Sequence, residues 1–180
     1  MNHYFEDYLW KKGKPVGKTV LSPQHISEAP QSYKIVSDPY YKRISVEKYV
    51  YAVFEKIVYD SVFLDFRKLQ PNEQTAWSKE LFKEDDTHQS SLIRDQYDRL
   101  ILIETSLFEQ GFCRECRISS SHGILVSVHR MYYKVLNDAF NGVVLFDAEG
   151  KAVMRKEYDA DPHTNEFTDL LKEDWETQSR

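Results

Sequence analysis

The chain has 180 residues, of which 41% are hydrophobic and 29% charged, and its formal net charge is -5. This length and composition suit a single globular domain with a real core, and they exclude a repetitive or fibrous protein. The acidic balance argues against a nucleic-acid-binding protein, which usually presents a basic surface, and no apolar run reaches the roughly 18 residues of a membrane-spanning helix.

Residues 1–44 predict an extended N-terminal arm. Asn2–Trp10 has the spacing of a short helix, but prolines interrupt regular structure after it. A cluster of lysines between residues 11 and 18 gives the arm local positive charge. Such a cluster is expected if the arm is simply exposed to solvent. The alternative is a docking segment for an acidic partner. The prolines are Pro15, Pro23, Pro30 and Pro39, and the lysines are Lys11, Lys12, Lys14 and Lys18.

Two helices and a strand are predicted after the arm. From Val46 to Ile57, apolar residues recur at i, i+3, i+4 and i+7 behind Ser45, which is a typical N-cap. The valines and aromatics of this segment also favour strands. Ser61–Leu69 alternates as a strand does, and Pro71 suits the first position of a second helix that would bury Trp77 and Leu81.

The stretch from Leu92 to Tyr158 predicts an antiparallel meander. Short blocks rich in valine, isoleucine, tyrosine and phenylalanine alternate with turns rich in glycine, asparagine, aspartate and serine. Such a run of strands joined by tight turns is the strongest fold signal in the chain. The predicted strands are Arg99–Phe108, Phe112–Ile118, Ile124–Leu136, Val143–Phe146 and Lys151–Tyr158.

Together these elements predict an α+β fold. A single domain over residues 45–160 would contain a twisted antiparallel sheet of five or six strands, with the two helices packed on one face. A closed or half-closed β-barrel is the alternative. Residues 161–180 are expected to form an acidic C-terminal tail with a short helix at Thr164–Trp175.

One arrangement in the meander predicts a ligand site. If Ile118 lies opposite Ile124, then Arg114, Arg130 and Tyr132 share an otherwise apolar face. Two guanidinium groups on an inward face need an anion, because an unpaired buried charge is very costly. In a cupped sheet they would hold the acidic head of an apolar ligand. Alternatively, a carboxylate such as Glu104 or Asp65 neutralises them, or the face is exposed to solvent.

Cys113 and Cys116 do not predict a metal site. Residues three apart on a strand point to opposite faces, so the two thiols could not share a zinc ion. The same register would place His129 opposite Cys113, the beginning of a nucleophilic site, but no oxyanion hole accompanies the pair. Without an export signal near Met1, we expect reduced thiols and a cytoplasmic location.

Two further motifs are rejected as catalytic. Gly13–Thr19 resembles a phosphate-binding loop but has three residues between its glycines where the loop needs four. Ser119–Gly123 contains serine and histidine but lacks the strained elbow of a hydrolase, and its composition is that of a hairpin turn.

Because no catalytic motif survives, the sequence favours a non-enzymatic, cytoplasmic protein-binding or adaptor protein. Its partner would be another protein or a second copy of the chain, and neither cofactor, metal nor nucleic acid is expected. The alternative is a carrier or enzyme for a small acidic, apolar ligand bound by Arg114, Arg130 and Tyr132.

Overall fold

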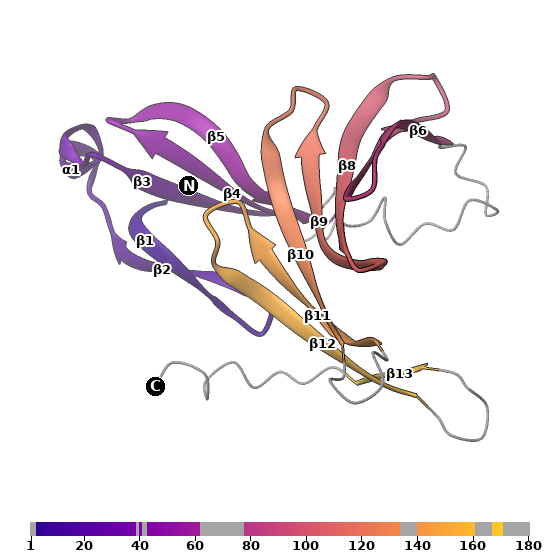
Figure 1. Cartoon of the computed structure of the whole chain (residues 1–180). Helices are drawn as coiled ribbons and strands as arrows, with labels where there is room; N and C mark the ends of the chain where they lie inside the picture. Colours follow the sequence, from indigo (N-terminus) through magenta and orange to yellow (C-terminus); the bar gives the residue numbers. More distant parts are fainter. Residues whose placement is uncertain are drawn as a thin grey trace.

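The protein is built almost entirely from antiparallel strands (Figure 1). The structure is a computed structural model, and it describes residues 3–38, 40, 43–61, 78–133, 140–160 and 167–170, with side chains as far as residue 155. One short helix, α1 (Pro23–Glu28), lies between the second and third strands and is capped by Ser22. The expected α+β class is therefore wrong.

The first sheet has five strands in the order β2-β1-β3-β4-β5. Its two edges are β2 and β5, and Pro15 in β2 is tolerated because an edge strand does not need every N–H group. The strands are β1 (Tyr4–Lys11), β2 (Lys14–Val20), β3 (Ser32–Asp38), β4 (Arg43–Val50) and β5 (Val53–Asp60).

The second sheet has eight strands, and each pairs with its neighbours in the chain, in the order β13-β12-β11-β10-β9-β8-β7-β6. The meander predicted between Leu92 and Tyr158 is thus confirmed and extends further in both directions. The strands are β6 (Ser78–Glu84), β7 (His88–Arg94), β8 (Leu100–Glu109), β9 (Phe112–Ser120), β10 (Leu125–Tyr133), β11 (Phe140–Asp147), β12 (Ala152–Ala160) and β13 (Phe167–Leu170).

The two sheets share one core. In Figure 1 the indigo and purple strands of the first sheet lie beside β10, β11 and β12 of the second. The buried residues of this core come mainly from the first sheet, and Leu145 and Val153 join them from the second. The members from the first sheet are Tyr8, Trp10, Tyr33, Val46, Val58 and Tyr59.

The turn between β11 and β12 fastens the sheets together. The Ala148 N–H donates to the carbonyl of Val58 in β5 at 2.9 Å. The carboxylate of Glu149 lies 2.9 Å from the ammonium group of Lys56. Burial by itself would raise the pKa of this carboxylate, but its lysine contacts outweigh burial and hold the pKa below the ordinary value. Lys151 donates to the Tyr8 carbonyl at 2.8 Å and pairs with Asp7.

The helix predicted from Ser45 to Ile57 is wrong, because this segment forms the hairpin of β4 and β5. Its valines and aromatics follow their strand preference. The turn between the strands, Tyr51-Ala52, has positive φ at both residues, 46° and 62°. Because this turn contains neither glycine nor asparagine, nothing in the sequence marked a break between the two strands. Their apolar residues therefore had the spacing expected of one continuous helix.

The segments expected to be an irregular arm and a helical tail also contain strands. Residues 1–44 include β1, β2 and β3, and Asn2–Trp10 overlaps β1, so the helix predicted there is wrong. In the predicted tail, Phe167–Leu170 pairs with β12 as a strand. The predicted domain limit at residue 44 falls inside β4. The strand expected at Ser61–Leu69 and the start of the second helix lie outside the described residues, apart from Ser61.

Candidate functional site

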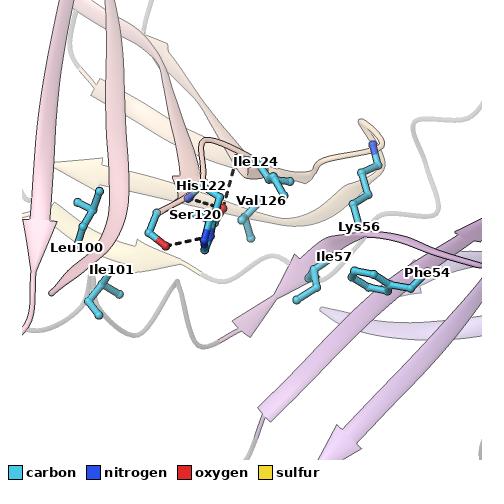
Figure 2. Close-up of a pocket in the computed structure, with 10 residues that line it drawn as sticks. Phe54, Lys56, Ile57, Leu100, Ile101, Ser120, His122, Ile124 and Val126 are labelled. Carbon is cyan, nitrogen blue, oxygen red and sulfur yellow. Dashed lines mark hydrogen bonds between the residues drawn. The ribbon is translucent and has the colours of Figure 1, made fainter.

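A largely apolar cleft lies between the two sheets, where β5 faces the start of β8 and the β9–β10 turn (Figure 2). Its volume is about 400 Å³, which falls in the range of sites that bind small molecules or side chains. Three segments far apart in the sequence contribute to it. The lining residues are Phe54, Lys56, Ile57, Leu100, Ile101, Ser120, Ser121, His122, Ile124 and Val126.

The first sheet supplies Phe54 and Ile57 from β5. This strand has two bulges, because Glu55 and Val58 are extra residues relative to β4. Bulges turn side chains out of the regular alternation and discourage another strand from adding to an edge. The edge of β5 is therefore shaped to present side chains to the cleft rather than to pair with a further strand.

The second sheet supplies Ile124 and Val126 across the cleft from β5, as Figure 2 shows. Val126 is buried, whereas Ile124 and Phe54 remain 45% and 52% exposed. Beyond Phe54, the hairpin tip leaves Tyr51 and Val53 still more exposed, at 61% and 69%. The exposed apolar side chains at the mouth of the cleft and on the adjacent hairpin tip are together called the cleft surface (Tyr51, Val53, Phe54 and Ile124).

The polar residues of the cleft belong to the β9–β10 turn and to β5. The hydroxyl of Ser120 accepts hydrogen bonds from the N–H groups of His122 and Ile124, each at 3.3 Å. The hydroxyl of Ser121 is 3.3 Å from His122 Nδ1. No carboxylate lines the described cleft, so nothing there orients the imidazole as a catalytic triad requires. The two serines and the histidine hydrogen-bond to one another and to the backbone, and these contacts shape the turn.

The prediction of a ligand site assumed a register between β9 and β10 that differs from the observed one. Ile118 lies opposite Ser127 instead of Ile124, after a bulge between Leu125 and Ser127. Arg130 consequently faces Glu115, and its Nε donates to that carboxylate at 3.1 Å. Burial opposes ionisation of Glu115, but hydrogen bonds from Arg117 and Arg130 outweigh it and keep its pKa below the ordinary value.

Arg114 and Arg130 have different neighbours in the structure. The guanidinium group of Arg130 stacks on Phe146 at 4.9 Å from the ring centre. That of Arg114 stacks instead on Tyr133 at 4.8 Å, so the contacts described for the two arginines have no residue in common. Tyr132 is 45% exposed.

The cysteine region also differs from the predicted register. His129 lies opposite Cys116 rather than Cys113. Cys113 and Cys116 are not joined by a disulfide bond, and Cys116 is buried. Among the described residues, no group of three or more His, Cys, Asp or Glu side chains is placed to hold a metal ion.

No protein-family model matches the sequence, and a search of the curated proteins found no relative. Within the described ranges, no helix has the length and apolar character needed to cross a lipid bilayer. The cleft surface is the feature of the structure that points to a function, and the sequence did not reveal it. Its residues lie in three separate segments, and only the packing of the sheets brings them together.

Proposed function

We propose that this protein is a non-enzymatic, cytosolic binding protein that takes apolar side chains of a partner protein into the cleft between its sheets. The observation that supports this function is the cleft surface itself. Large apolar side chains remain exposed around an apolar cleft, and contiguous exposed apolar groups mark interaction sites on folded proteins.

A protein partner fits this surface better than an enclosed small molecule. Binding pockets for small molecules usually bury most of the ligand, whereas here Phe54 and Ile124 stand at the mouth of the cleft, half exposed. Tyr51 and Val53 extend the apolar surface beyond the cleft onto the hairpin tip. An apolar side chain of the partner would enter the cleft while neighbouring residues of the same partner cover the tip.

The expected contribution of these side chains is measurable. Full burial of a large apolar side chain contributes about 1.5–3 kcal/mol. Covering the exposed halves of Phe54 and Ile124 should therefore add roughly 1 kcal/mol each. An aspartate in either position would also have to lose its hydration on binding, so a single substitution should weaken the complex by about tenfold or more.

The test is capture of a partner from native cells by the tagged full-length chain. The chain offers matched controls on β6, where Phe82 is 53% exposed and Leu81 46% exposed. Phe54→Asp and Ile124→Asp should each lose the captured protein, while Phe82→Asp and Leu81→Asp should retain it. Equal capture by all four variants, or equal loss in all four, would contradict the proposal.

A further inference from the structure

Arg114 occupies an unusual position at the end of β9 remote from the cleft. It is an extra residue relative to β8, since Leu107 pairs with Glu115 and Phe108 with Cys113. Such a bulge redirects a side chain. The guanidinium group stacks on Tyr133 at 4.8 Å and on Phe112 at 5.6 Å.

The surroundings hold this guanidinium group in place. The ring of Tyr133 packs against Phe112 at 5.1 Å and against Phe140 at 5.7 Å. The Tyr133 hydroxyl donates to the Cys113 carbonyl at 2.8 Å. The aromatic platform is therefore fixed, and an arginine stacked on it has already lost part of the side-chain freedom that binding would otherwise remove.

Within the described part of the chain, Arg114 nevertheless lacks a strong hydrogen-bond acceptor. Its Nε is buried and has no hydrogen-bond partner among the described residues. The carboxylate of Glu109 forms only a long ion pair, 3.8 Å from Nε, and the Glu109 side chain is 75% exposed. Other arginines of the described chain are better satisfied: Arg43 pairs with Asp60, Arg99 with Asp95, and Arg117 and Arg130 with Glu115.

We propose that Arg114 is an anion-binding site that accepts a carboxylate or phosphate group from a ligand or partner. The planar guanidinium group offers parallel N–H donors that match both groups. The incoming anion would displace the side chain of Glu109 and supply the acceptor that Nε lacks. The site is independent of the cleft, because Arg114 and Ser120 lie toward opposite ends of β9.

The test follows the arginine Nε–H signals of the full-length ¹⁵N-labelled protein by NMR. Inorganic phosphate, acetate and chloride are added separately at matched ionic strength, so that phosphate, carboxylate and simple screening are distinguished. The Arg114 signal should shift saturably with phosphate or acetate and not with chloride. The Arg117 signal should show no saturable shift with any of the anions, because Arg117 already pairs with Glu115 on the same strand.

Two variants complete the experiment. Glu109→Gln should tighten anion binding by about two- to fivefold, because it removes a competing exposed carboxylate. Arg114→Gln should abolish the saturable response, and Arg117→Gln should preserve it. The proposal is overturned if the Arg114 signal of the unaltered protein shifts no differently with phosphate or acetate than with chloride. It is also overturned if Arg117→Gln abolishes the response. Neither of these two outcomes requires the Arg114 variant to fold.

Discussion

A single buried carboxylate, that of Asp147, connects the two sheets. Its Oδ2 accepts hydrogen bonds from the Tyr8 hydroxyl at 2.6 Å and from the Trp10 indole at 2.7 Å. Its Oδ1 accepts the N–H groups of Glu149 and Lys151 in its own turn, at 3.0 and 2.9 Å. Four donors thus satisfy a charge that would otherwise be very costly to bury.

Removing this carboxylate should destabilise the whole protein. Asp147→Ala leaves the Tyr8 hydroxyl and the Trp10 N–H without an acceptor in the core, so we expect a loss of about 2–4 kcal/mol in the free energy of unfolding. Asp85→Ala is the control, because Asp85 accepts only turn hydrogen bonds at the surface. Urea denaturation measures both, and equal losses would contradict the role of Asp147.

Tyr8 should make the stability sensitive to alkaline pH. Burial, followed by the charge of Asp147, raises the pKa of the Tyr8 hydroxyl above the ordinary tyrosine value of about 10. The folded state therefore favours the protonated phenol, and its contribution is fully present below pH 10 and is lost as the pH rises further. Urea denaturation from pH 8 to 11 should show a smaller alkaline loss for Tyr8→Phe than for the unaltered protein; identical pH profiles would contradict this prediction.

Among the elements, the β4–β5 hairpin shows most clearly where the sequence misleads. Val46, Tyr49, Val50, Val53 and Phe54 have helical spacing, and only their β preference argued otherwise. The turn that separates them lacks glycine. By contrast, Asp147–Gly150 and the turns around Gly111 and Gly123 carry ordinary turn residues, and the strands between them were predicted nearly to their ends.

The β9–β10 hairpin shows a different limit, since both of its strands were predicted and its register was not. The bulge between Leu125 and Ser127 adds one residue on one side. Because side chains alternate along a strand, a shift in register changes which residues face each other. The prediction that Arg114, Arg130 and Tyr132 share one face depended on that register. The alternation of side chains along each strand does not by itself reveal which register the strands adopt.

The Tyr51-Ala52 turn should be a point where stability and binding conflict. Positive φ costs a residue with a side chain about 1–2 kcal/mol. Replacing the pair by Asn-Gly, which suits this turn, should therefore raise the free energy of unfolding by about 1–2 kcal/mol. It should also weaken partner capture, because it removes the exposed ring of Tyr51.

Lys12→Asn is the matched control, since Lys12 also has positive φ, 50°, in a two-residue turn between β1 and β2. This change should leave capture unaltered. Denaturation and capture assays on the same variants separate the two effects. A more stable Asn-Gly variant that captures its partner normally would show that Tyr51 is not part of the binding surface.

At the scale of the whole molecule, the cleft results from how the sheets are joined. The β11–β12 turn fixes one end of the contact, through Asp147 and Tyr8, which are 139 residues apart in the sequence. The cleft lies elsewhere along the contact, between β5, the start of β8 and the β9–β10 turn. Neither alternation nor composition reports which distant strands meet, so the meander strands of the second sheet were predictable from the sequence, whereas the first sheet and the cleft were not.

The most direct test of the binding function is photo-crosslinking in native cells from single positions of the full-length chain. A photoreactive phenylalanine analogue at Ile124 should crosslink to one partner protein, and the same analogue at Leu81, an equally exposed position on the second sheet, should not. Crosslinking of that partner from Leu81 as strongly as from Ile124, or from Leu81 alone, would contradict the assignment of the cleft as the binding site.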